Sequence, residues 1–240
     1  DIDFNIRHGN TLVGYATADE TEKAVKGATQ GNLFSDAWED IRIRLTAVEQ
    51  QYNNFQIQQV QRGGHVSAAD KQALTDTLSE LEGMLNYHLA REYGVNTTNV
   101  NNFVAWKSNH QPFHWYVDFY PLMATGGFDT IIGNPPYLEF REIDYALRGY
   151  GTSDSSAVHA VCMERSHKLL QPLGAMSMIV PLALVSTQRM KAVQNILENG
   201  RTVWYSNFAW RPAKLFDTVN RALTIFVAIP RGSGKVFTTA

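Results

Sequence analysis

Phe128-Asp-Thr-Ile-Ile-Gly-Asn-Pro-Pro-Tyr137 is the part of this 240-residue chain that says most about its architecture. Residues 128–132 form a short apolar run, which predicts a buried strand. Two prolines follow almost at once, and each fixes its own φ angle and lacks an N–H donor. The sequence therefore predicts a strand that ends at a stiff loop, residues 134–137. In open α/β sheets, ligands bind at this carboxyl end of a strand.

The chain beyond this loop alternates between helical and strand patterns. Helices are predicted over residues 157–170 and 188–199, and strands over residues 175–180, 202–208 and 222–229. Strand, helix, strand, helix, strand is the order of a mostly parallel sheet with helices on its faces, so we predict an α/β fold. The Gly-x-Gly in residues 231–235 lacks the context of a phosphate-binding motif and is predicted to be a plain loop.

Residues 17–110 have a different, helical character. Apolar side chains recur at steps of three and four along two stripes, which are Trp38, Ile41, Leu45, Val48, Tyr52 and Phe55, then Leu74, Leu78, Leu81, Leu85 and Leu89. Ser67 with Asp70 can cap the second helix, and Gly94 can end it. The stripes predict an antiparallel helical hairpin whose two apolar faces pack together. A coiled coil that binds a partner is the alternative.

The first residues and the last half of the chain are predicted to share one core. Residues 1–15 begin with short apolar alternation, which predicts a strand ending near Arg7 and then a turn. We therefore predict three parts, namely a strand and turn of the core in residues 1–16, a helical insertion in residues 17–110, and the catalytic core in residues 111–240.

Composition restricts the class of protein. Hydrophobic residues make up 44% of the chain, enough to bury a substantial core. The single cysteine, Cys162, excludes an internal disulfide and predicts a cytoplasmic protein. No apolar run approaches the roughly 20 residues of a membrane helix. The seven histidines show no ligand spacing with Cys162, so no metal site is predicted, and His114 and His159 are expected to be structural.

Charge is distributed unevenly along the chain. Residues 1–133 contain 9 basic and 16 acidic residues, a net charge of −7, whereas residues 134–240 contain 12 and 7, a net charge of +5. A positive second half suits a polyanionic partner. Ordinary solvated surface is the alternative explanation.

The 134–137 loop has the groups that methylation of an amine requires. The Asn134 side-chain oxygen and the Pro135 carbonyl can both accept hydrogen bonds from one –NH₂ group. Such a grip favours a tetrahedral nitrogen, whose lone pair is no longer delocalised into a ring and can attack a sulfonium methyl. The Tyr137 ring can stack on a planar base. The alternative is a purely structural turn.

These residues resemble motif IV of the amino-methyltransferases that act on DNA adenine. The wider stretch, Pro112-Phe-His-Trp115 and then residues 126–137, is similar to the large methylase-restriction polypeptides of type IIG. Residues 163–181 and residues 204–216, followed by Arg221, extend the resemblance. It covers residues 111–229 well and residues 1–15 weakly, and the helical region carries no family signal.

The resemblance implies a partial Rossmann-like methyltransferase sheet, S-adenosylmethionine as cofactor, and double-stranded DNA with a flipped adenine. By motif position, Asn134, Pro135, Pro136 and Tyr137 would hold that adenine. Phe216 would lie against the other face of the base, or else belong to the core. Asn10 would bond the adenine of the cofactor, or else form a turn. Arg211 and Lys214 flank the base pocket and would contact phosphates, or else lie in a solvated loop.

The chain also departs from the family. The glycine-rich cofactor loop and the acidic residue that holds the cofactor ribose are not in the sequence. Where relatives often have Asp-Leu-Tyr, this chain has Ala157-Val158-His159, which weakens a cofactor role for that helix start. We therefore expect a fragment of a longer restriction-modification protein that is inactive alone. Its exposed sheet edge can pair with a second copy of the chain.

Two other functions remain open from the sequence. Protein methyltransferases that modify a glutamine side-chain amide use the same Asn-Pro-Pro-Tyr, because an amide –NH₂ also has a delocalised lone pair. The helical region and residues 204–216 argue against this alternative, since those relatives are compact. The other possibility is a DNA-binding fragment without catalysis.

Overall fold

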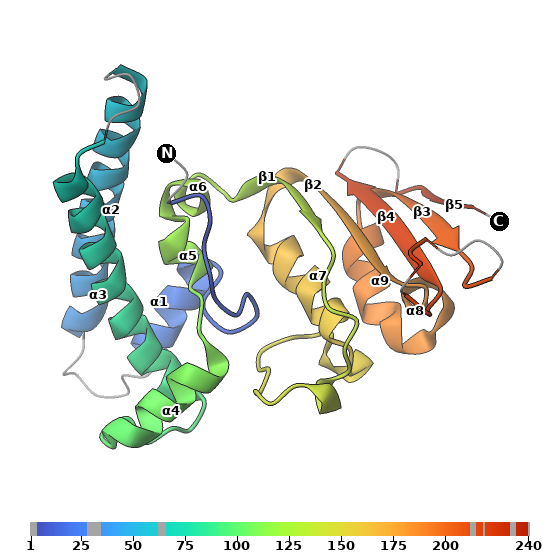
Figure 1. Cartoon of the computed structure of the whole chain (residues 1–240), viewed down its shortest axis with the longest axis horizontal. Helices are drawn as coiled ribbons and strands as arrows, with labels where there is room; N and C mark the ends of the chain where they lie inside the picture. The colour runs from blue at the N-terminus through green and yellow to red at the C-terminus, as the bar shows by residue number, and fades with distance from the viewer. Residues whose placement is uncertain are drawn as a thin grey trace. The chain divides into compact units, whose positions relative to one another are not determined.

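A computed structural model describes residues 4–27, 35–61, 66–211, 215–217, 219–230 and 234–239. The chain forms two compact units, Asp1–Thr125 and Gly126–Ala240 (Figure 1). The first unit is helical, and the second contains the sheet.

The first unit consists of six described helices, namely α1 (Ala18–Gly27), α2 (Ser35–Gln61), α3 (Ala68–Glu92), α4 (Val100–His110), α5 (Trp115–Asp118) and α6 (Tyr120–Ala124). Helices α2 and α3 lie side by side, which confirms the predicted hairpin (Figure 1). Their stripes are buried as expected except at Trp38, which is partly exposed, and Ile41 and Leu81 are both fully enclosed. The Ser67 hydroxyl accepts a hydrogen bond from the Asp70 N–H at 3.0 Å and so caps α3.

The strand predicted at the start of the chain is wrong for the residues that can be described. Residues 4–7 form a turn and a bend, and the extended pairing nearby is a single bridge between Asn10 and Pro112. The reason is that Phe4 packs edge-on against Tyr52 and Phe55 of α2. Its neighbours therefore follow a helix surface and not a sheet edge. That residues 1–16 complete the same core as residues 111–240 remains a prediction.

A buried pair of carboxyl groups lies inside the helical unit. Asp118, at the end of α5, is 4% exposed and shares a hydrogen bond with Glu82 of α3. Burial, and then the charge of Glu82, raise the pKa of Asp118 to about 7, although Arg7 opposes the shift. In the folded protein Asp118 is therefore protonated below about pH 7 and charged above it.

This pair predicts a pH-dependent stability. The unfolded Asp118 has a pKa near 3.8, so between about pH 4 and pH 7 the folded state binds more protons, and stability falls as pH rises. Asp118→Asn should remove part of this loss of stability with rising pH, because the asparagine amide can donate to Glu82 but cannot ionise. We expect a higher melting temperature than wild type at pH 8 and little difference at pH 4.5, measured by thermal unfolding. Asp40→Asn, at an exposed position of α2, is the control. Parallel pH curves for wild type and Asp118→Asn would contradict this account.

The second unit is built on a sheet of five described strands in the order β1-β2-β4-β3-β5. They are β1 (Phe128–Gly133), β2 (Leu170–Pro181), β3 (Thr202–Phe208), β4 (Leu223–Ile229) and β5 (Val236–Thr238). β1 is parallel to β2 and β5 is parallel to β3, whereas β4 is antiparallel to both β2 and β3. Only β4 is therefore reversed among these strands, which confirms the predicted α/β class with a mostly parallel sheet.

The helices of this unit are α7 (Val158–Leu169), α8 (Ala183–Ser186) and α9 (Lys191–Glu198), with the short turns η1 (Phe140–Glu142), η2 (Ser153–Ser155) and η3 (Gln188–Met190). The predicted helices and strands are all present, with bounds shifted by a few residues. The strand at residues 128–132 is not buried as predicted, because β1 has one described neighbour, β2, and Ile132 is 79% exposed. β5 was not predicted, because its three residues are all exposed and carry no alternating pattern.

One face of the sheet forms the core with these helices. Alternate residues point to this face, among them Met176, Met178, Phe226, Val203 and Tyr205, and they pack with Ala160, Met163, Leu184, Val193 and Leu197. Alternation in β2 and β4 is what a strand with one covered face shows. This packing fixes the strand ends from which the site is built.

Because β4 is reversed, four chain segments meet at one edge of the sheet, namely the edge formed by the carboxyl ends of β1, β2 and β3. β1 ends at Gly133 and the parallel β2 ends at Pro181, which pairs with Leu223 at the start of β4. Leu223 also pairs with Phe208, the last residue of β3. The segments that follow β1, β2 and β3, and the one that precedes β4, therefore meet at this edge (Figure 1).

Candidate active site

The 134–137 loop leaves the sheet at this edge. Asn134 is exposed, Pro135 is buried, and Tyr137 is partly buried. The prolines restrict the backbone, so the exposed amide of Asn134 sits on a rigid support. The loop therefore presents a hydrogen-bonding side chain to solvent at the end of β1, as the sequence predicted.

Tyr137 fixes the amide of Asn134. The Tyr137 hydroxyl lies 2.7 Å from the Asn134 Oδ1 and 3.3 Å from the Ile179 carbonyl oxygen of β2. Burial raises the pKa of this hydroxyl above its usual value, so it is protonated and donates at neutral pH. The shorter contact is the stronger of the two, and it leaves Oδ1 a second lone pair for a ligand. Sequence reasoning foresaw only the ring face of Tyr137 and missed the role of its hydroxyl.

This contact makes a prediction for Tyr137→Phe. The phenylalanine ring can still stack, but it cannot orient the Asn134 amide. A typical hydrogen bond contributes about 1 kcal/mol, so we expect kcat for methyl transfer to fall about fivefold with little change in KM. Tyr137→Ala, which removes the ring as well, should lower kcat further and raise KM. Steady-state kinetics of the two variants will separate the contribution of the hydroxyl from that of the ring. Equal kcat and KM for both variants would show that the ring contributes nothing beyond the hydroxyl.

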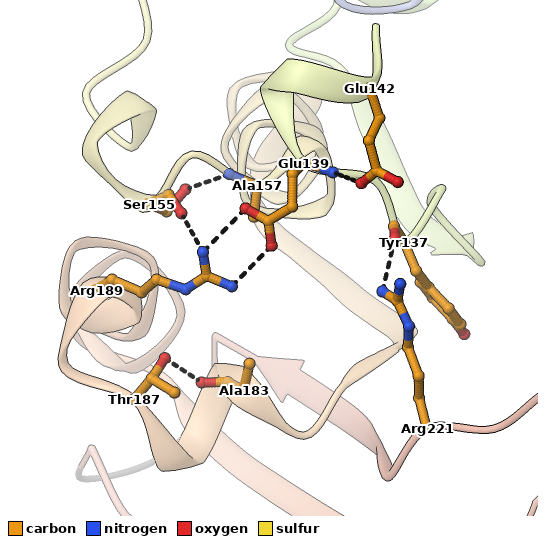
Figure 2. A network of polar contacts seen from close by, with 9 residues as sticks. All are labelled: Tyr137, Glu139, Glu142, Ser155, Ala157, Ala183, Thr187, Arg189 and Arg221. Carbon is orange, nitrogen blue, oxygen red and sulfur yellow. Dashed lines mark hydrogen bonds and ion pairs between the residues drawn. The ribbon is translucent and has the colours of Figure 1, made fainter.

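Two arginines hold the loop from outside it (Figure 2). Arg221, just before β4, donates to the Tyr137 carbonyl at 2.8 Å. Arg189, in η3, donates to both oxygens of Glu139 at 2.9 and 3.0 Å and to the Ser155 carbonyl at 3.1 Å. Hydrogen bonding to Arg189 lowers the pKa of the Glu139 carboxyl, so the pair is ionised.

The backbone after the loop is tied to the start of α7. Phe140 donates to the Ser156 carbonyl, and Val158 donates to the Leu138 carbonyl, both at 2.9 Å. The Glu139 N–H is bonded at 2.7 Å to the Glu142 carboxylate (Figure 2). Glu139 and Arg189 were not identified from the sequence, because residues 50 positions apart give no local signal of pairing.

The two buried histidines differ. His114 is a satisfied structural residue, since its Nδ1 accepts from the Tyr15 N–H and its Nε2 lies 3.1 Å from the Asn86 Oδ1. His159 of α7 is 3% exposed, and both its ring nitrogens lack a hydrogen-bond partner among the described residues. Burial lowers its pKa to about 4, so the ring is neutral near pH 7. The expectation of a structural role therefore fits His114 better than His159.

The residues predicted for the base pocket and for phosphate contacts lie in the connection between β3 and β4. Phe216 is 38% exposed, and the Arg211 guanidinium lies 4.8 Å from the centre of the Trp210 ring. Lys214 lies outside the described residues. Phe216 and Arg211 are thus surface groups on a segment that starts and ends at the edge bearing the 134–137 loop. Their contacts with a base or with phosphate remain predictions.

Asn10, in the helical unit, forms the turn that was its alternative reading. Its Oδ1 accepts from the Leu12 N–H at 3.1 Å, and its backbone N–H donates to the Gln111 carbonyl at 2.7 Å. The side-chain NH₂ is then the donor left to meet a ring nitrogen. A hollow beside it is lined by Gly9, Thr11, Phe113, Trp115 and Phe119. Asn5, Ile6 and Arg7 also line this hollow, whereas Asn10 does not. Cofactor binding by Asn10 therefore remains a prediction.

No metal or membrane site accompanies these groups in the part of the chain that can be described. Its histidine, cysteine and acidic side chains form no cluster of three or more that could hold an ion. None of its helices is long and apolar enough to cross a membrane.

The second unit thus combines an α/β fold with an Asn-Pro-Pro-Tyr loop, whose Asn134 is exposed, after its first described strand. The model of the Eco57I restriction-modification methylase family matches residues 20–216, most of the chain, and the chain belongs to this family. S-adenosylmethionine, the cofactor that the sequence predicted, is the methyl donor that membership of this methylase family supports. No curated protein matches the chain.

Three solved structures are distantly similar. A nuclease-deletion mutant of the Type ISP restriction-modification enzyme LlaGI with a DNA substrate mimic is 13% identical over 52% of this chain, with a TM-score of 0.40. A Listeria monocytogenes protein described as a class I S-adenosylmethionine-dependent methyltransferase is 13% identical over 68%, with a TM-score of 0.36. The DrdV–DNA complex is 10% identical over 70%, with a TM-score of 0.38. The chain spans only 13%, 55% and 23% of their respective lengths, and no conclusion about activity follows from them.

Proposed function

We propose that this chain provides the acceptor side of a DNA adenine methyltransferase within a restriction-modification protein. The observation that carries the proposal is the exposed Asn134 amide, oriented by the Tyr137 hydroxyl at 2.7 Å on a Pro-Pro support. Such an arrangement suits a planar molecule with an exocyclic –NH₂ group, and adenine in DNA is the substrate of this kind that family membership favours.

The proposed reaction joins the amine nitrogen to a methyl carbon. When bound, S-adenosylmethionine would supply the electrophilic methyl group, and the electron pair of the S–CH₃ bond would go to sulfur. The second lone pair of the Asn134 Oδ1 and the Pro135 carbonyl accept the two amine hydrogens, which favours a tetrahedral nitrogen. Neither oxygen is basic enough to keep a proton, so the extra proton on the methylated nitrogen leaves to solvent.

DNA is the proposed partner, with the target adenine flipped out of the duplex. Charge supports this, since residues 134–240 carry a net charge of +5 and would attract a polyanion. Arg211 is an exposed cation that suits a phosphate, and the Phe216 ring suits the free face of a base. A cytoplasmic location belongs to the same proposal, because DNA and the cofactor are both available there.

The test is methyl transfer by the full-length protein that contains this chain. It is incubated with S-adenosylmethionine carrying a tritiated methyl group and either unmethylated plasmid DNA or a glutamine-containing peptide. We expect label in DNA, and digestion to nucleosides should yield N6-methyladenosine in its deoxy form by mass spectrometry. Label in the peptide alone would favour a glutamine amide methyltransferase. DNA binding without any transfer would favour a module that lacks catalysis.

A further inference from the structure

We propose that Arg189 and Glu139 are a positioning pair that sets the place of the 134–137 loop for methyl transfer. The proposal rests on the proposed function and names two residues that act through the loop without touching the reacting atoms. Glu139 lies two residues after Tyr137, and Arg189 comes from η3, which follows the neighbouring strand β2.

The pair joins the segment that follows β1 to the segment that follows β2. Arg189 grips both oxygens of Glu139 at 2.9 and 3.0 Å and also donates to the Ser155 carbonyl just before α7 (Figure 2). A bidentate contact fixes direction as well as distance, which a single charge contact does not. The loop after β1 is thereby fixed to the segment after β2 and to the start of α7.

The solvent exposure of the two side chains indicates that the pair positions the loop and contributes little to folding stability. The side chains of Arg189 and Glu139 are 41% and 29% exposed, and ion pairs so open to water contribute little to folding stability. Methyl transfer, however, depends on the alignment of Asn134 to a fraction of an ångström. Loss of the pair should therefore affect the rate much more than the stability.

Mutation of Arg189 leaves the other anchors of this region in place, namely the bond from Arg221 to the Tyr137 carbonyl and two backbone contacts. The backbone contacts are the bonds from Phe140 to Ser156 and from Val158 to Leu138. These should keep the loop attached when the pair is broken, so that the loop shifts without the unit unfolding. Among the charged and titratable groups, His159 and Arg141 also influence the Glu139 carboxyl, but Arg189 is the group that bonds it.

The experiment compares Arg189→Gln, Glu139→Gln, the double variant and Arg189→Lys in the full-length protein. We expect each single change to lower kcat about tenfold with unmethylated plasmid DNA, with KM and melting temperature nearly unchanged. The double variant should be no slower than either single one, because both remove the same contact. Arg189→Lys should recover only part of the rate, since lysine cannot make the two-pronged contact. Arg42→Gln, which breaks the exposed pair with Glu39 on α2, is the matched control and should leave kcat unchanged.

A direct contact between Arg189 and a DNA phosphate predicts a different pattern. Arg189→Gln would then raise KM for DNA, and Glu139→Gln would lower it by removing a negative charge, and this result would overturn the proposal. Wild-type kcat for every variant would also overturn it. Hydrogen exchange gives a readout that does not depend on the substrate that accepts the methyl group. If the pair fixes the loop, amides in residues 138–142 should exchange faster in Arg189→Gln than in wild type. If wild type transfers no methyl group to DNA, the proposed function fails, whereas unchanged exchange defeats the positioning pair.

Discussion

Asn134→Ala is expected to lower kcat for DNA methylation by at least about 100-fold, with a much smaller change in KM for DNA. Removing one preorganised hydrogen-bonding group from a reaction centre typically costs about 100-fold to 1000-fold in rate. The Asn134 Oδ1 is exposed and held by the Tyr137 hydroxyl, so its position does not need to be organised when the substrate arrives. Without it, the amine keeps its lone pair delocalised in the ring.

The loss should be specific to the chemistry of the amide. Asn195→Ala removes an exposed asparagine from α9 and should leave the rate unchanged. Asn134→Ala should also leave the melting temperature within a few degrees of wild type, because an exposed side chain contributes little to the core. Single-turnover kinetics with saturating DNA and cofactor measure the step directly. Wild-type turnover in Asn134→Ala would show that the 134–137 loop does not bind the amine.

Gly127→Ala is expected to destabilise the second unit by more than about 3 kcal/mol, combining backbone strain with a steric overlap. Gly127 has a φ of +110°, and a Cβ there would lie 2.3 Å from the Leu169 carbonyl oxygen and 3.1 Å from the Gln171 N. Both atoms are backbone, so relief requires β1 to move away from the start of β2. The 134–137 loop would move with it, and methyl transfer should be lost together with stability.

Gly126→Ala is the matched control for this change. Gly126 has a φ of +113°, almost the same as that of Gly127, but nothing lies within 4 Å of a Cβ built there. It should therefore carry only the strain of the backbone, about 1–2 kcal/mol. Urea unfolding of both variants, followed by the near-ultraviolet signal, measures the difference. Equal losses would mean that the Leu169 carbonyl yields easily and that β1 is not seated as tightly as the contact suggests.

Local patterns were sufficient to predict much of this architecture. The leucine stripe of α3 carries the period of a helix and is buried in the structure. The run at residues 128–132 forms β1 as predicted, but the prediction that this strand is buried is wrong, because its residues are half-buried or exposed. The position of Asn134 just after a strand could be predicted from the two prolines, because proline ends a strand by a local effect that does not depend on distant contacts. The direction of β4 did not follow, because alternation in Leu223–Ile229 records which face is buried but not which way the strand runs.

Contacts between residues that are far apart in the chain could not be predicted from the sequence. Nothing in the neighbourhood of Arg189 indicates that it will meet Glu139, and Arg221 was notable only as part of a resembling segment. The start of the chain misled for a related reason. Phe4 lies in a sequence pattern typical of strands, but a strand forms only where a neighbouring strand can pair with it. In the structure the Phe4 ring packs instead against Tyr52 and Phe55 of α2.

The reversal of β4 makes residues 209–222 a hairpin connection that leaves and re-enters the sheet at the same edge. A crossover in a parallel sheet must traverse the whole layer, and its length is constrained by that path. A hairpin connection has no such constraint, since its ends stay paired at Phe208 and Leu223 whatever lies between them. Related enzymes can therefore lengthen, shorten or exchange this segment without altering the register of the sheet. Arg221, near the end of this segment, donates to the Tyr137 carbonyl, so a protein engineer who grafts new selectivity here should keep Arg221 in place.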